Sequence, residues 1–150
     1  MKKLLKSIFL LFCIICFNSC STSLAVVANG TDISKYEYVV FGKETEGDRS
    51  LDDIIMLVQN EISNTRLVVV SSKEGYNLMM HGKHVLSPHI SVNSEKWDGG
   101  HTYITINFYD YRTDQSVIVV KSSGIGLTVS HDQQIALGAI KTKLLEIFKK

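Results

Sequence analysis

The 150-residue chain is long enough for one domain with a buried core, and its 45% hydrophobic and 21% charged residues are typical of a folded globular protein. Residues 1–19 contain three lysines and no acid, so the rest of the chain has 13 basic and 15 acidic residues and a formal charge of −2. This balance provides no electrostatic basis for binding nucleic acid, and we expect no nucleic-acid partner.

The first 19 residues have the layout of a secretory signal peptide. Lys2, Lys3 and Lys6 precede an eleven-residue run, 7–17, in which only Ser7 is polar. As a helix this run would rise about 16 Å, roughly half of a hydrocarbon core about 30 Å thick, so it is too short to span a bilayer. A basic flank followed by a short apolar run predicts a cleaved signal peptide over residues 1–19.

The end of this segment, Phe17-Asn18-Ser19-Cys20, resembles the lipobox of bacterial lipoproteins in the looser form of Bacteroidota-type bacteria. The resemblance implies that Cys20 receives a diacylglyceryl group and becomes the new N-terminus. Ser21 stands where an aspartate would resemble an inner-membrane retention signal, which implies the outer membrane. The uncharged residues that follow imply its periplasmic face. Because each buried CH2 contributes about 0.8 kcal/mol, two or three acyl chains would anchor a small domain firmly.

The other two cysteines, Cys13 and Cys16, form a C-x-x-C pair inside the apolar run. Neither a thiolate nor a metal site is stable there, so a place in the signal peptide explains the pair better than a redox or metal role. After cleavage Cys20 is the one cysteine left. We therefore expect no intramolecular disulfide, despite the oxidising compartment.

The rest of the chain divides at the turn signal Asn29-Gly30 and the strand pattern that follows it. Residues 20–35 are predicted to be a lipidated tether and residues 36–150 a single α/β domain. In chain order, apolar spacing and residue type predict a strand over 36–41, a helix over 51–62, strands over 67–70 and 76–86, a hairpin of strands 102–109 and 116–121 joined by 110–114, and a helix over 130–148. Residues 87–100 show no regular pattern.

These elements predict an α+β fold with the order β-α-β-β-β-β-α, in which two helices pack on one face of a mostly antiparallel sheet. The layout resembles uncharacterised small envelope lipoprotein domains and the amino-terminal domain family of TolB proteins, over residues 32–150. The segments that carry the resemblance are Asp32-Ile-Ser-Lys-Tyr36, at the first strand, and Phe108-Tyr-Asp-Tyr-Arg-Thr113, at the late hairpin. A shared fold does not determine function.

Histidines are the candidate metal ligands, because zinc needs three or four ligands that converge on one point. His81 and His84 would point to opposite faces of a strand, so they cannot form a pair there. If a metal site exists, its ligands are His84, His89 and His101; the simpler interpretation is that these are surface or loop histidines. No cofactor motif is present, and we expect no cofactor.

Aromatic residues are the candidate partner-binding residues. Tyr103, Tyr109, Tyr111 and Trp97 lie in or beside the predicted hairpin, and strand alternation places Tyr103 and Tyr109 on one face, opposite Ile106. Tyrosine and tryptophan provide large contact area at low entropic cost, so an exposed face that bears them can bind a partner. The alternative is that these residues stiffen a half-exposed sheet through cross-strand pairs.

Other patterns have structural explanations. Asp52 and Asp53 lie where acids stabilise a helix N-terminus, and the acids of 44–48 belong to a solvated loop, so neither set indicates paired catalytic carboxylates. Gly124-Ile-Gly126 lacks the third glycine and the helix that a phosphate-binding loop requires. No serine lies in a G-x-S-x-G elbow, so the sequence predicts no catalytic residues.

Three hypotheses about function remain. The first is a non-enzymatic envelope lipoprotein, an adaptor anchored through the lipid on Cys20 that binds another envelope protein. The second is an anchored carrier that holds a small apolar ligand or a glycan between the helices and the sheet. The third is a metal-dependent hydrolase, which depends on the histidines alone. The sequence favours the first, and it gives no oligomeric state.

Overall fold

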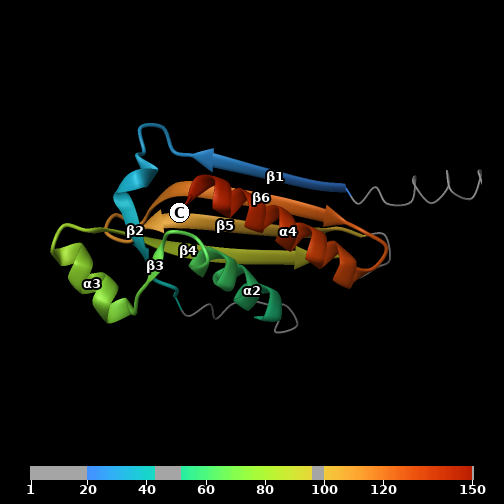
Figure 1. The fold of residues 1–150 in the computed structure, drawn as a ribbon, viewed down its shortest axis with the longest axis horizontal. Coiled ribbons are helices and arrows are strands. Elements are labelled where there is room, and N and C mark those ends of the chain that lie inside the picture. Colours follow the sequence, from blue (N-terminus) through green and yellow to red (C-terminus); the bar gives the residue numbers. More distant parts are fainter. Residues whose placement is uncertain (1–19, 43–51, 96–99, 150) are drawn as a thin grey trace, which may run out of the picture.

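A computed structural model of the protein describes residues 20–42, 52–95 and 100–149. The predicted signal peptide, the acidic loop of 44–48 and Trp97 lie outside these residues. The described part folds into one sheet with helices on both of its faces (Figure 1). Its elements are β1 (Cys20–Val27), the short 3-10 helix η1 (Ile33–Lys35), β2 (Tyr36–Val39), α2 (Asp52–Ser63), β3 (Val68–Val69), α3 (Ser72–Met80), β4 (His84–Ser94), β5 (Thr102–Asp110), β6 (Gln115–Ile125) and α4 (Val129–Ile147).

The six strands form one mixed sheet in the order β1-β6-β5-β4-β2-β3. The strands β1, β6, β5 and β4 pair antiparallel with one another, whereas β2 pairs in parallel with both β4 and β3. The long hairpin of β5 and β6 forms the middle of the sheet. The chain therefore places its N-terminal strand and its shortest strand at the two opposite edges.

Two helices, α2 and α4, cover one face of the sheet and enclose the main core. Val58 and Ile62 of α2 and Ile140 and Leu144 of α4 are fully buried, as is Phe108 on the facing side of β5. The ring of Phe108 packs edge-on against Phe148, which caps the end of α4, with ring centroids 5.3 Å apart. Completely buried side chains thus fill the space between these helices and the sheet.

The third helix, α3, packs on the opposite face, at the end of the sheet where β2, β3 and β4 meet. Leu86 belongs to the main core, but its neighbour Val85 belongs to a second cluster with Val40 and Val70. Adjacent strand residues point to opposite faces, so this second cluster lies behind the sheet. Gly75 of α3 allows the close approach, because a Cβ there would lie 2.3 Å from Cγ2 of Val40.

The predicted order β-α-β-β-β-β-α, with two helices on a mostly antiparallel sheet, is wrong. Three helices are present in the described residues, the sheet is mixed, and helices lie on both faces. The α+β class itself holds. One cause is β1: residues 20–27 were expected in a tether, but all eight pair with β6, a contact about a hundred residues away that has no local signal.

The second cause is α3, where residues 76–86 were predicted as a strand. Ser71 begins the helix, since its hydroxyl accepts a hydrogen bond from the N–H of Glu74, and the S-x-x-E spacing was a readable capping signal. Gly82, with a φ of +79°, ends it. The strand begins only at His84, so the prediction overlaps it at residues 84–86 alone; the strand continues to Ser94 through residues 87–94, where no element was expected. Within the described residues, no helix is long and apolar enough to cross a bilayer.

Candidate partner-binding surface

Among the described residues, no helix covers the sheet face opposite α2 and α4 over the strands β1, β6 and β5 and over residues 87–94 of β4. Residues paired across strands share a face, so the register defines this surface. We call it the open face; it comprises Thr22, Leu24 and Val26 of β1, Ser116, Val119, Lys121 and Ser123 of β6, Tyr103, Thr105, Asn107 and Tyr109 of β5, and Ser87, His89, Ser91 and Asn93 of β4. Lys121 is the single residue of this set with a formal charge.

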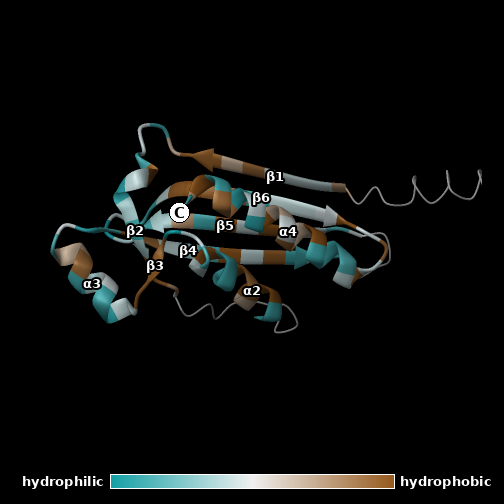
Figure 2. Cartoon of the chain, in the orientation of Figure 1, coloured by the Kyte–Doolittle hydropathy of each residue, from teal (hydrophilic) through white to brown (hydrophobic). Residues whose placement is uncertain are grey.

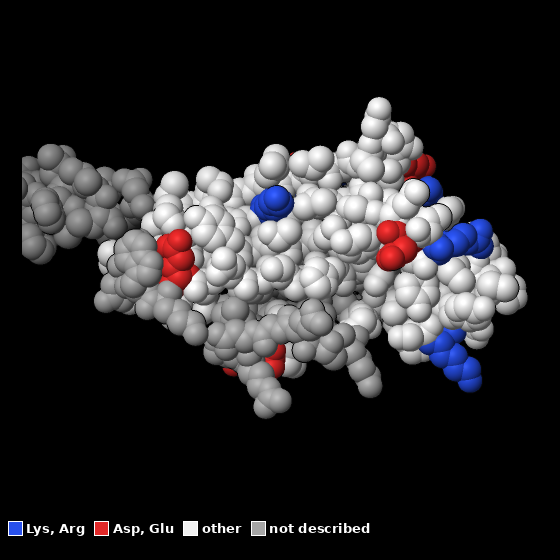
Figure 3. Space-filling model, turned by 180° about the vertical axis from the view of Figure 1, so that it is seen from behind, with Lys and Arg blue, Asp and Glu red and all other residues white. Residues whose placement is uncertain are grey.

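The open face is nearly neutral over its middle. Figure 3 shows the molecule from this side: above the grey atoms its middle is white apart from one blue group, and the other coloured side chains lie toward the ends and the lower edge. Hydroxyl, amide and aromatic groups dominate the set, with exposed apolar side chains at the β1 edge, where Leu24 is 57% and Val26 54% exposed. A neutral face of this kind presents contact area that needs little charge desolvation on binding.

Tyr103 and Tyr109 both lie on the open face, on the side opposite the buried Ile104, Ile106 and Phe108. Tyr103 is 43% exposed and its ring lies 5.8 Å from that of His101. Tyr109 is half-buried, and its hydroxyl accepts a 2.7 Å hydrogen bond from the amide of Asn107. The neighbouring Ser116 hydroxyl donates to the same amide group, so this part of the face is held in place.

Tyr111 does not join them. It packs against the second cluster beneath α3, and its N–H donates to the carbonyl of Val85 at 2.9 Å. The open face therefore brings together two of the four aromatic residues that the sequence suggested, and Trp97 lies outside the described residues. The polar residues of β4 on this face were not predicted, because no strand was assigned to residues 87–94.

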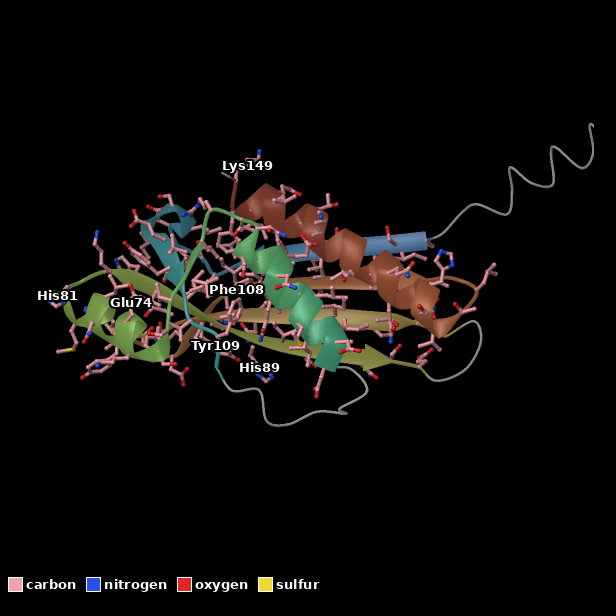
Figure 4. The ribbon with its side chains drawn as sticks, turned by 60° about the horizontal axis from the view of Figure 1, so that its bottom comes forward. Glu74, His81, His89, Phe108, Tyr109 and Lys149 are labelled. Carbon is pink, nitrogen blue, oxygen red and sulfur yellow. The ribbon has the colours of Figure 1, made fainter. Side chains whose placement is uncertain are left out.

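The three candidate metal ligands do not converge. His84 lies beside Tyr36 and 4.0 Å from a carboxylate oxygen of Asp110, His89 lies on the open face (Figure 4), and His101 lies 3.6 Å from Glu95 at the other end of β4. No group of three or more His, Cys, Asp or Glu residues that could hold a metal ion occurs in the part of the chain that the structure describes. The three described histidines therefore do not form the metal site on which the hydrolase hypothesis depends.

A buried polar cluster joins β2 to the turn after β5. The Tyr36 hydroxyl donates a 2.8 Å hydrogen bond to Oδ2 of Asp110, and the N–H groups of Arg112 and Thr113 donate to Oδ1. Burial acts to raise the pKa of Asp110, but these donors outweigh it and hold the pKa below its usual value. Burial, with Asp110 beside it, raises the pKa of Tyr36. Both carboxylate oxygens are occupied, so the cluster stabilises a turn rather than forming a reactive site.

The glycines of Gly124-Ile-Gly126 allow α4 to pack against the end of β6. A Cβ on Gly124 would lie 2.3 Å from the carbonyl oxygen of Asp132 and 2.5 Å from the nitrogen of Ala136. The N–H of Gly126 donates to the buried Asp132 carboxylate. This segment is a packing motif, in agreement with its lack of a phosphate-loop pattern.

Cys20 is an exposed free cysteine at the first position of β1, directly opposite Ile125. The strand begins at the cysteine itself, so no free linker separates this residue from the sheet. Leu127, two residues after Ile125, is 81% exposed. The end of the molecule that carries Cys20 therefore also carries its most exposed large hydrophobic side chain among the described residues.

No family model matches the sequence, and no curated protein matches it. Solved structures share its fold at low identity. A PelC dodecamer from Paraburkholderia phytofirmans has 14% identity and a TM-score of 0.50, and the match covers 87% of this chain and 98% of that one. A dodecamer of a PelC variant from the same organism has 14% identity and a TM-score of 0.53, and the match covers 85% of this chain and 98% of that one. A PDZ domain protein from Parabacteroides distasonis has 12% identity and a TM-score of 0.50, covering 97% of this chain and 40% of that one. These likenesses concern the fold alone.

Proposed function

We propose that the chain is the precursor of an envelope lipoprotein, and that its mature domain is a non-enzymatic adaptor anchored through a lipid on Cys20. The anchor part depends on the sequence: a basic flank, a short apolar run and a lipobox-like ending at Cys20. The exposure of Cys20 at the start of β1 is compatible with acylation, because the thiol is not buried in the core. The outer membrane, on its periplasmic side, is the proposed location.

The observation that carries the adaptor part is the open face. A four-stranded surface with one formal charge and with Tyr103 43% exposed is suited to contact with another protein rather than to catalysis. We propose an envelope protein as the partner. In the part of the chain that the structure describes, buried side chains occupy the space between the helices and the sheet, which does not favour the carrier alternative.

Self-assembly belongs to the same proposal. The two PelC structures that share this fold are dodecamers. A surface that binds a partner and an edge that binds another copy can coexist, because the open face consists of side chains, whereas the edge of β1 would pair through its backbone N–H and C=O groups. An anchored protein is also confined to a plane, which raises the effective concentration of its copies.

Photo-crosslinking in intact cells tests the adaptor proposal. A photoreactive residue in place of Tyr103 should give a covalent complex of defined mass with one envelope protein. The matched control is the same residue in place of Glu146, which is exposed on α4, on the opposite side of the sheet. Crosslinks of equal yield from both positions, or none from position 103, would contradict the proposal.

A further inference from the structure

The edge strand β1 lacks the features that normally protect a sheet edge. Natural edge strands are short, charged, bulged or interrupted by proline, because their unpaired N–H and C=O groups otherwise bind another strand. The opposite edge, β3, is only two residues long. In contrast, β1 has eight residues in unbroken register with β6, and residues 20–31 contain no charged residue and no proline.

The side chains of β1 are also apolar toward the end of the strand, on both faces of the sheet. Leu24 and Val26 are more than half exposed, Val27 is 38% exposed, and Figure 2 shows this part of the strand in brown. Hydrogen bonds within the described residues use one side of the strand. The other side carries a row of backbone groups that can accept a further strand.

The alternation of hydrogen bonds along β1 shows which residues point their backbone groups away from β6. The N–H of Ala28 donates a 2.9 Å hydrogen bond to the carbonyl of Val117, and these two residues directly follow the last β1–β6 pair, Val27 and Ile118. In an antiparallel ladder such bonded pairs alternate with unbonded ones. The even-numbered residues of β1 therefore bond to β6, and Ser21, Ser23, Ala25 and Val27 present their N–H and C=O groups to solvent.

We propose that β1 pairs antiparallel with β1 of a second copy of this chain. The inference rests on the proposed function, in that it identifies the strand through which copies assemble. A two-fold axis places an edge strand opposite itself, so any charge on the edge would meet the same charge on its partner. The β1 edge carries no charged residue, so pairing with a second copy brings no like charges together. The same absence gives the edge no means of selecting a different partner strand by opposite charge.

The pairing has a consequence for the anchor. Antiparallel pairing places the two Cys20 residues toward opposite ends of the shared ribbon, and eight strand residues span about 26 Å. Both lipids can enter one membrane only if the ribbon lies along the membrane surface. The two open faces then form one continuous surface on the same side of a larger sheet.

The test uses the lipidated mature protein, extracted in detergent, with its molar mass measured by light scattering. Wild type should be a dimer or a multiple of it. Ser23→Pro removes one outward N–H without removing a bond to β6, and edge strands accept proline at such positions, so its mass should fall to one protomer. Ser23→Ala, the matched control, should keep the wild-type mass.

Two further measurements make the outcome decisive. A circular dichroism melt checks that Ser23→Pro is folded; if it is not, Ser23→Lys provides the alternative, since it places like charges together in the paired edges. A monomeric wild type, or folded Ser23 variants that keep the wild-type mass, would overturn the inference. Failure of the proposed function is separate and visible in the same sample, as a Cys20 that carries no acyl chains.

Discussion

The Tyr36 hydroxyl and the Asp110 carboxylate, 74 residues apart in the sequence, form a 2.8 Å hydrogen bond inside the fold. They belong to the two segments, 32–36 and 108–113, that carried the resemblance in layout. Asp32 holds the first segment in η1 by accepting from the Ser34 N–H, and Asp110 holds the second in its turn. The bond between Tyr36 and Asp110 therefore connects two locally specified turns across the sheet.

Tyr36→Phe should lower the free energy of unfolding by about 1.5–3 kcal/mol near neutral pH, because it removes a donor to a buried, charged acceptor. The pKa of Asp110 is lowered in the fold, so its contribution to stability is complete above the unfolded-state pKa of about 4 and is lost as the pH falls through the folded-state value. The difference between wild type and variant should shrink over that acid range.

Urea denaturation at a series of pH values measures this effect. Tyr38→Phe is the control, since Tyr38 lies on the same strand and is half-buried beside the second cluster. Its cost should be smaller and should not vary between neutral and acid pH. A Tyr36→Phe cost that stays constant down to strongly acid pH would show that the ionised carboxylate is not the source.

Gly124→Ala should destabilise the protein by about 1–3 kcal/mol, because the new Cβ meets the backbone of α4 at Asp132 and Ala136. Gly138→Ala is the matched control within α4, where a Cβ meets nothing within 4 Å. Alanine is the better helix former by about 1 kcal/mol, so this control should be neutral or stabilising. Thermal unfolding of both variants tests the pair; equal effects would contradict the packing role of Gly124.

Local signals explain which parts of the fold the sequence predicted. The period of two in residues 102–109 identified β5 and its two faces, and the spacing of Ile54, Val58 and Ile62 identified α2. Cys20–Val27 could not be recognised as a strand, because its strand character comes from pairing with β6. For α3 a signal existed at Ser71 and Glu74, but the apolar residues at 76–80 suited a strand equally well.

The candidate surface was predicted in part for the same reason. Alternation within one strand placed Tyr103 and Tyr109 together. Which other residues join them depends on strand order and register, and these are tertiary properties. The histidines illustrate the reverse case: they are close in the sequence, but β4 and the loop before β5 carry His84 and His101 to opposite ends of the sheet.

Tyr103→Ala should change the free energy of unfolding by no more than about 0.5 kcal/mol, because Tyr103 is 43% exposed and lies outside the core. Ile106→Ala, on the other face of the same strand and fully buried, should cost about 2–5 kcal/mol. Denaturant titration of the two variants compares the faces directly. A Tyr103 variant as unstable as the Ile106 variant would mean that this face is covered in the native protein.

Leu127 should lie at the membrane surface, since Cys20 pairs with Ile125 and leaves the lipid no linker. In the acylated mature chain, Leu127→Cys introduces the one free thiol, which can carry an environment-sensitive fluorophore. Its emission in phospholipid vesicles should shift to the blue relative to detergent-free buffer. Met80→Cys is the control, because Met80 is 63% exposed and α3 lies at the opposite end of the sheet (Figure 1). Equal shifts at both positions would contradict this orientation.

The central claim is that the mature protein begins at an acylated Cys20. Mass spectrometry of the N-terminal peptide from the membrane fraction tests it most directly. The account predicts a peptide that begins at Cys20 and carries the added mass of a diacylglyceryl group, and a Cys20→Ala chain that keeps residues 1–19 and no lipid. An unmodified Cys20, or a mature chain that begins at another residue, would contradict it.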